Sequence, residues 1–419
     1  MSNPATVATA STRAWIVVAT VFLNFVVVYG IWYASSVFLV ALLNEFGWSR
    51  SLLAGAFSTF ILVKSLLGPP TGWLAYRLGP KRLILAGGAI MAVGLVLAAE
   101  TTAWWHLYLA FGGVAAVGMS CAGWVTAVIL IREWFPTRLG TALGVASAGI
   151  GVGIFAMTPL AQLLIEWCGW RWAYRIFGLL TAGWVLPATL YLIRSPSGRE
   201  AGTSAGEGTE GSEGTGPHWT LADAARSWRF WGVAGAYFTG NVVTQMLLIH
   251  QVVYLVDLGV PPLTAATVAG TVGLVSIGSK VGWGVLSDRA GREWAATLAF
   301  ACVAASVGAL ALAGRHPDTV LPYLYATLIG IGYGVLSSVF PAIAADLFGG
   351  PGFSTIYGTL YTAIGLGLAL GTWGAGQIFD WTGTYAVALW LGLVLALVTP
   401  ALIWVVAPRH PNPPPRNSA

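Results

Sequence analysis

Long apolar runs separated by short polar stretches make up most of this chain. An apolar run of about 20 residues is long enough for an α-helix to cross the hydrocarbon core of a bilayer. The first six such runs cover residues 15–43, 51–76, 82–101, 104–131, 139–167 and 172–193. The next six cover residues 229–257, 263–287, 294–313, 319–346, 353–379 and 384–406. The pattern predicts an all-α membrane protein with twelve transmembrane helices in two groups of six.

A polar segment separates the two groups of runs. Residues 195–218 read SPSGREAGTSAGEGTEGSEGTGPH and show no apolar period. Such a composition is typical of a flexible, solvated linker. We therefore expect four regions: an N-terminal six-helix half (1–194), a flexible cytoplasmic linker (195–220), a C-terminal six-helix half (221–408) and a cytoplasmic tail (409–419).

Composition supports a membrane location, and the basic residues indicate an orientation. Hydrophobic residues make up 57% of the chain and charged residues 8%, whereas soluble domains carry about 25% charged residues. Cytoplasmic loops of membrane proteins are enriched in Lys and Arg. With a cytoplasmic N-terminus, fourteen of the 20 Lys and Arg residues fall in inner loops and tails, and four fall in outer loops. Both termini are therefore expected in the cytoplasm.

The two remaining basic residues, Lys64 and Lys280, lie inside apolar runs. Lys280 is seven residues from Ser287 at the cytoplasmic end of its run, which is about 10 Å of helix rise. A charge inside the membrane is costly and usually marks a substrate or ion site. The alternative for Lys280 is a structural lysine bound to a backbone carbonyl, and for Lys64 a snorkelling or packing role.

Two loops show that the halves repeat each other. GWLAYRLGPK (residues 72–81) and GVLSDRAGRE (residues 284–293) align at an offset of 212 residues. At this offset Lys64 maps onto Ser276, which is one helical turn from Lys280 on the same helix face. We therefore expect the two lysines at similar depth in opposite halves. Repeated six-helix halves are typical of transporters, and two cations without carboxylate neighbours would attract an anion.

The second loop resembles the G-x-L-x-D-R-x-G-x-R/K signature of the major facilitator superfamily. The resemblance covers nearly the whole chain and implies a fold of two pseudo-twofold-related six-helix halves. In that family the charged residues of this loop tie helix ends together at a cytoplasmic gate. The same role is implied here for Asp288, Arg289 and Arg292, and for Arg77 in the first copy. Tyr76 occupies the acidic position of the first copy, which predicts a weaker charge relay there.

Four further segments look like the monocarboxylate porter branch of that superfamily: VFLVALLNEFGWSRS, REWFPTRLGTALGVASAGIGVG, GWRWAYRIFGLL and IHQVVYLVDLGV. In those porters a buried arginine of the eighth span binds the substrate carboxylate, and Lys280 occupies the matching position. Lysine keeps the charge but lacks the planar, bidentate fork of arginine. The oxalate–formate exchangers belong to the same broad neighbourhood.

Other polar residues inside the runs are candidates for the same site. Ser276 shares a helix face with Lys280, and we expect it to line the substrate site with Lys64, Tyr29, Tyr333 and Tyr361. Tyrosines also occupy membrane interfaces for purely structural reasons.

A second candidate stripe lies at the end of the seventh run. His250 and Asp257 fall on one helix face with Tyr254, and a His with a carboxylate on one face can carry protons. We expect a proton-coupling role for both. A helix-end or gate role for Asp257 is the alternative.

The resemblance implies proton-coupled symport of small monocarboxylates such as lactate or pyruvate, by alternating access. It further implies a bacterial protein of the inner (plasma) membrane that functions as a monomer, with the carboxylate, a proton and the lipid bilayer as its partners. Exchange of a dianion such as oxalate, using Lys64 and Lys280, is the main alternative. A non-transporting membrane receptor on a transporter scaffold is less favoured. The sequence shows no P-loop, metal-ligand cluster or Ser-His-Asp pattern, so we expect neither an enzyme nor a cofactor, a metal site or nucleic-acid binding.

Overall fold

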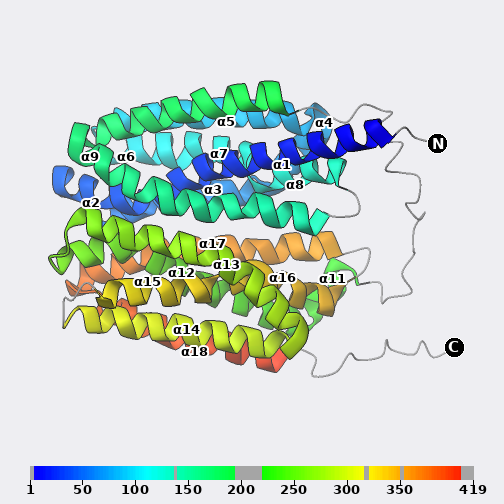
Figure 1. Cartoon of the computed structure of the whole chain (residues 1–419). Coiled ribbons are helices and arrows are strands. Elements are labelled where there is room, and N and C mark those ends of the chain that lie inside the picture. Colours follow the sequence, from blue (N-terminus) through cyan, green and yellow to red (C-terminus); the bar gives the residue numbers. More distant parts are fainter. Residues whose placement is uncertain (1–3, 136–138, 194–218, 316–319, 350–352, 407–419) are drawn as a thin grey trace. The chain divides into compact units, whose positions relative to one another are not determined.

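The computed structural model describes residues 4–135, 139–193, 219–315, 320–349 and 353–406. Over these ranges the chain is helical and contains no β-strand (Figure 1). It divides into two compact units: Met1–Gly208 with Pro261–Leu274, and Thr209–Val260 with Val275–Ala419. The expected all-α class is confirmed over the described ranges.

The first unit consists mainly of the helices coloured blue to green in Figure 1. They are α1 (Pro4–Tyr33), α2 (Ser35–Phe46), α3 (Arg50–Leu66), α4 (Gly68–Leu78), α5 (Pro80–Ala99), α6 (Trp104–Leu107), the π-helix η1 (Tyr108–Ala115), α7 (Ala116–Ala122), α8 (Trp124–Trp134) and α9 (Leu139–Leu192). Helix α9 packs against both α1 and α5. Aromatic rings fill the core, where Trp32 stacks on Phe60 with ring centroids 4.4 Å apart.

The second unit consists mainly of the later helices, coloured green to red. They are α11 (Leu221–Arg226), α12 (Trp228–Asp257), α13 (Pro262–Ala290), α14 (Arg292–Ala313), α15 (Val320–Tyr333), α16 (Val335–Phe348), α17 (Phe353–Thr382) and α18 (Ala386–Val406). Helix α12 packs against α17 and α18, and α14 packs against α15. Helix α13 contributes its residues up to Leu274 to the first unit.

Nine helical stretches of the described chain are long and apolar enough to cross a membrane. A tenth is added if α3 and α4, which meet at a 50° bend, count as one span. One of the nine, Ala142–Leu192, includes a non-helical break at Gly169. The 30-residue helix α17 lies outside this set. The described helices are therefore compatible with the twelve spans expected from the sequence.

Four of the expected spans are interrupted within their length. The interruptions lie at Ala34 between α1 and α2, at Leu67 between α3 and α4, at Gly123 between α7 and α8, and at Gly334 between α15 and α16. Gly123 leaves the helical region completely, with φ −92° and ψ −153°. A helix end exposes backbone N–H or C=O groups that have no partner within the helix. In transporters, such discontinuous helices commonly form the ligand site.

The internal repeat extends from the sequence to the backbone conformation. Six glycines of the described chain have a positive φ angle, and they form three pairs: Gly47 with Gly259, Gly79 with Gly291, and Gly169 with Gly383. The first two pairs are separated by 212 residues and the third by 214. Side chains strongly disfavour positive φ, so glycine is the default residue there. The same turns therefore recur at equivalent places in both halves.

Glycines also bring two pairs of helices into backbone contact. A Cβ atom added to Gly153 of α9 would lie 2.5 Å from the Val26 oxygen of α1, and one added to Gly367 of α17 would lie 2.5 Å from the Phe238 oxygen of α12. Val26 and Phe238 are again 212 residues apart. Small residues at such crossings let membrane helices approach closely.

Candidate functional site

A lysine and a tyrosine meet at the helix break in the second unit. Lys280 lies on α13 and is half-buried. Its ammonium is 5.5 Å from the centroid of the Tyr333 ring, a distance at which a cation is attracted to the ring face. Tyr333 is the last residue of α15. Its hydroxyl oxygen is buried and has no hydrogen-bond partner among the described residues. A cation and an unused hydroxyl together can bind an anion.

Two side chains of α13 hold this arrangement in place. The Ser279 hydroxyl donates a hydrogen bond to the Gly330 oxygen (2.8 Å), and the Trp283 indole N–H donates to the Ile331 oxygen (2.6 Å). Both acceptors belong to the last turn of α15, where carbonyls lack an intrahelical partner. Lys280 therefore lies beside a helix C-terminus, whose partial negative charge favours a cation. The sequence predictions missed Ser279 and Trp283, although their i, i+4 spacing places them on one face of α13.

Two other residues expected at the site, Ser276 and Tyr361, lie on α13 and α17. Ser276 is fully buried one turn along α13, and Tyr361 is half-buried on α17. Over the described ranges, neither makes a hydrogen bond with the Lys280 side chain. No carboxylate of these ranges lies within ion-pair distance of Lys280 either.

The first unit contains a second lysine–tyrosine pair. Lys64 lies in the last turn of α3, and its ammonium is 5.3 Å from the centroid of the Tyr29 ring of α1. The Tyr29 hydroxyl accepts a hydrogen bond from the backbone N–H of Trp124 (3.2 Å), the first residue of α8. Lys64 is half-buried and likewise has no carboxylate within ion-pair distance in the part of the chain that the structure describes. Both pairs therefore lie next to a helix break.

His250 and Asp257, the two candidates for proton coupling, have different environments on α12. His250 is buried, and its ring nitrogens contact the Tyr385 hydroxyl (Nδ1, 2.9 Å) and the Thr372 oxygen (Nε2, 2.8 Å). A carbonyl can only accept, so Nε2 carries a proton, and in the neutral ring Nδ1 accepts from Tyr385. Asp257 is exposed at the end of α12. The two residues thus lie at different depths in the unit.

The loop between α13 and α14 forms an ion-pair cluster. The Arg292 guanidinium contacts Asp288 (2.5 Å) and Asp346 of α16 (3.1 Å), and it donates to the Ser287 hydroxyl (2.7 Å). Sequence reasoning missed Asp346, which is 54 residues away along the chain. Arg289 points to the surface and is exposed.

The matching loop of the first unit lacks such a cluster. Arg77 is exposed and stacks on the Trp73 ring at 4.2 Å. No carboxylate of the described ranges pairs with it. Tyr76, at the acidic position of the repeat, is 88% exposed. The two loops thus differ in their contacts, with a carboxylate–guanidinium cluster in the second and an exposed arginine on a tryptophan ring in the first.

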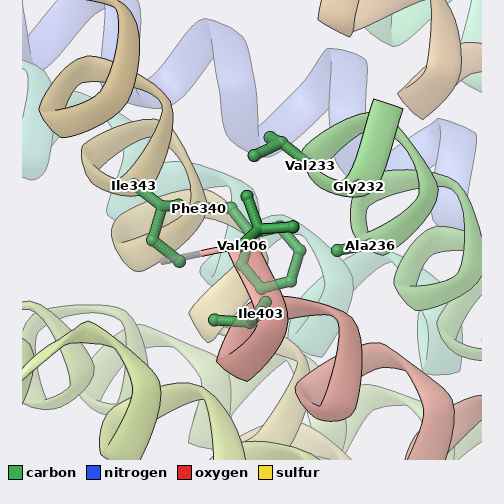
Figure 2. A pocket seen from close by; sticks show the side chains of 7 residues that line it. All are labelled: Gly232, Val233, Ala236, Phe340, Ile343, Ile403 and Val406. Atoms are coloured by element: carbon green, nitrogen blue, oxygen red, sulfur yellow. The ribbon is translucent and has the colours of Figure 1, made fainter. Parts of the chain in front are cut away.

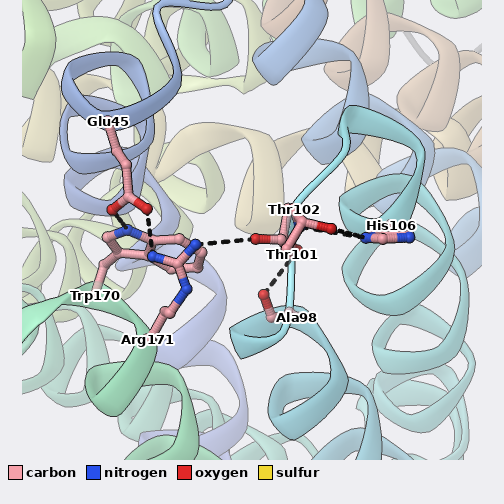
Figure 3. A network of polar contacts seen from close by, with 7 residues as sticks. All are labelled: Glu45, Ala98, Thr101, Thr102, His106, Trp170 and Arg171. Atoms are coloured by element: carbon pink, nitrogen blue, oxygen red, sulfur yellow. Dashed lines mark hydrogen bonds and ion pairs between the residues drawn. The ribbon is translucent and has the colours of Figure 1, made fainter.

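A polar clamp ties three segments of the first unit together, as Figure 3 shows. The Glu45 carboxylate at the end of α2 accepts hydrogen bonds from the Trp170 indole and the Arg171 guanidinium, which directly follow the Gly169 break. Arg171 also donates to the Thr101 oxygen (3.2 Å) between α5 and α6. Glu45, Trp170 and Arg171 lie within the porter-like segments of the sequence, but the sequence predictions gave them no role.

The pocket drawn in Figure 2 is not a binding site for a charged ligand. Its walls are Gly232, Val233, Ala236, Phe340, Ile343, Ile403 and Val406. None of these side chains is polar, so nothing in them could replace the hydration of an anion. Among the described residues, no group of His, Cys, Asp and Glu side chains is arranged to hold a metal ion. The lysine–tyrosine pairs are therefore the strongest candidates for ligand binding.

Comparisons with known proteins agree with this architecture. The sequence model of the Major Facilitator Superfamily matches residues 21–371 and 283–419. Monocarboxylate transporter 13 of Rattus norvegicus is 27% identical over 378 residues, which cover 88% of this chain and 83% of the relative. Monocarboxylate transporter 2 of Homo sapiens is 26% identical over 392 residues, covering 88% and 80%. Monocarboxylate transporter 3 of Rattus norvegicus is 26% identical over 385 residues, covering 90% and 76%.

Proposed function

Because the chain belongs to the major facilitator superfamily, we propose that it carries small monocarboxylates, of the lactate or pyruvate type, across a membrane together with a proton. Its relatives include monocarboxylate transporters, which are not enzymes. The observation that carries the proposal is Lys280, a half-buried cation in an apolar helix beside an unused tyrosine hydroxyl.

The surroundings of Lys280 suit a monocarboxylate. A carboxylate has two oxygens that accept hydrogen bonds, and the ammonium and the Tyr333 hydroxyl offer it two donors. Binding would satisfy a buried hydroxyl that otherwise lacks a partner, and an unsatisfied group of this kind costs about 1–3 kcal/mol. A 2-oxo or 2-hydroxy group on the substrate would add a further acceptor for the same donors.

Alternating access requires the bound state to cross the membrane without a large electrostatic penalty. A proton taken up together with the anion would make each transport cycle electroneutral. We assign this proton to Asp257, whose carboxylate is exposed. His250 is the second candidate, since both of its ring nitrogens already contact other groups.

We further propose that the chain crosses the membrane twelve times, with both termini in the cytoplasm. The break at Gly169 divides α9 into two spans, and α17 is long enough to supply another. Together with the ten stretches counted above, these additions give twelve spans. Excess basic residues in alternate loops favour cytoplasmic termini. We place the transporter as a monomer in a bacterial inner membrane.

Uptake by protein reconstituted in liposomes tests the proposal. Labelled lactate should accumulate when the outside is more acidic than the inside, and Lys280→Gln should abolish this uptake. Lys81→Gln is the matched control, because the Lys81 ammonium binds the Leu190 backbone oxygen (2.7 Å). Equal uptake with and without the proton gradient would refute the coupling. Full uptake by Lys280→Gln would refute the assignment of the site.

Exchange of a dianion such as oxalate is the second candidate function. It is favoured by Lys64, which has the same kind of surroundings as Lys280. Counterflow discriminates between the two functions. Uptake that is stimulated by internal unlabelled oxalate and is insensitive to pH would replace symport with exchange.

A further inference from the structure

The Tyr29 side chain contacts two positively polarised groups at once. Its ring faces the Lys64 ammonium at 5.3 Å from the centroid. Its hydroxyl accepts the Trp124 N–H at 3.2 Å. Tyr29 itself is 7% exposed, so both contacts are made in the interior of the first unit.

The two contacts serve different parts of the structure. Trp124 begins α8 immediately after the Gly123 break, and the first N–H groups of a helix have no intrahelical acceptor. The Tyr29 hydroxyl supplies that acceptor. The ring contact instead fixes the ammonium at the end of α3, where the helix stops at Leu66. The hydroxyl therefore contacts a helix end, whereas the ring contacts the cation.

We propose that Tyr29 is a positioning residue, whose ring holds the Lys64 ammonium ready for the substrate anion and whose hydroxyl does not contact the substrate. The inference rests on the proposed carboxylate transport. The Tyr29 ring is given the role of positioning the ammonium, and the Tyr29 hydroxyl the role of stabilising the start of α8. Tyr29 therefore differs in role from Tyr333, whose hydroxyl is free to bind the substrate.

Tyr333 provides the contrast within the same chain. Its ring lies against the Lys280 ammonium at 5.5 Å, close to the 5.3 Å of the first pair. Its hydroxyl, unlike that of Tyr29, is buried without a partner among the described residues. Removing the hydroxyl should therefore affect ligand binding at Tyr333 but not at Tyr29.

Three substitutions separate the ring from the hydroxyl. Tyr29→Phe keeps the ring and should leave the half-saturation concentration for lactate within about two-fold of wild type, because the face of phenylalanine also attracts cations. Tyr29→Leu removes the ring face and should raise that concentration about five- to thirty-fold. Tyr333→Phe keeps its ring but should raise it about five-fold or more, since a hydrogen bond to a charged group is lost.

Stability provides the second measurement. Tyr29→Phe should lower the melting temperature of the purified protein, because the Trp124 N–H loses its acceptor. A purely structural role would change the melting temperature of both Tyr29 variants and leave the half-saturation concentration of the folded fraction unchanged. A double substitution controls for misfolding: in a Lys64→Gln background, Tyr29→Leu should cause no further loss of affinity.

The possible outcomes are distinct. If Tyr29→Phe loses as much affinity as Tyr29→Leu, the hydroxyl binds the substrate and the inference is wrong. It is also wrong if Lys64→Gln and Tyr29→Leu both transport normally while Lys280→Gln does not, a result that leaves the proposed function intact. If the wild-type protein transports and binds no carboxylate, the proposed function itself fails.

Discussion

Replacing Gly153 with alanine would test the close crossing of α1 and α9. The added Cβ atom would lie 2.5 Å from the Val26 oxygen and 3.0 Å from the Gly30 nitrogen. Both neighbours are backbone atoms, which cannot rotate away as a side chain can. The two helices would have to separate, and the contacts along their interface would loosen.

The magnitude follows from two opposing terms. Forcing an extra carbon into a packed interface costs about 1–3 kcal/mol, and the rigid backbone neighbours of Gly153 favour the upper end. Alanine in place of glycine inside a helix stabilises the folded state by about 1 kcal/mol. Gly153→Ala should therefore lower the free energy of unfolding by about 2 kcal/mol.

Gly144 provides a control on the same helix. A Cβ atom there would meet nothing within 4 Å, so only the higher helix propensity of alanine acts. Gly144→Ala should therefore raise the free energy of unfolding by up to about 1 kcal/mol. Gly367→Ala and Gly374→Ala on α17 repeat the comparison, because Gly367 is crowded and Gly374 is open. The assay is thermal unfolding of the detergent-purified protein. A melting temperature of Gly153→Ala at or above that of Gly144→Ala would show that the close crossing is wrong.

Three further predictions concern charged and titratable groups. Asp346→Asn should weaken the half-exposed pair with Arg292 by about 0.2–1 kcal/mol, and thermal unfolding at low and high salt should show a smaller salt dependence than wild type; an unchanged salt dependence would contradict the ion pair. Lys280→Arg should lower the half-saturation concentration for lactate, because a guanidinium binds a carboxylate through two parallel hydrogen bonds; a higher concentration would mean that the site cannot accept the planar group. Asp257→Asn should flatten the pH dependence of uptake. His250→Gln should lower the melting temperature and leave the pH dependence of uptake unchanged. A flattened pH dependence in His250→Gln but not in Asp257→Asn would assign the proton to His250.

The helices themselves follow from local sequence. The apolar run at 229–257 becomes α12 (Trp228–Asp257), and the run at 294–313 becomes α14 (Arg292–Ala313). An apolar run of this length has few alternatives to a membrane helix, since its backbone groups must be satisfied within the segment. The repeat was also readable, because the turn glycines Gly79 and Gly291 are required by the backbone itself.

The partners of the functional residues could not be predicted in the same way. Arg292 pairs with Asp346, and Trp170 pairs with Glu45 across 125 residues of chain. Such pairs depend on which helix faces meet, and hydrophobic periodicity gives only the face that each helix buries. The break at Gly334 was missed because apolar residues continue on both sides of it. The role of Ser279 in capping the end of α15 was consequently missed as well.

The hydrogen bonds from Ser279 and Trp283 to the end of α15 also bear on how a transporter could work. They join the helix that carries Lys280 to the helix that carries Tyr333, and all four residues belong to the second unit. In many transporters the halves move largely as rigid bodies during alternating access. A cation and a hydroxyl fixed within one such body would keep their mutual geometry while that body moves. The ammonium and the hydroxyl would then meet a carboxylate in the same arrangement at every stage of that movement.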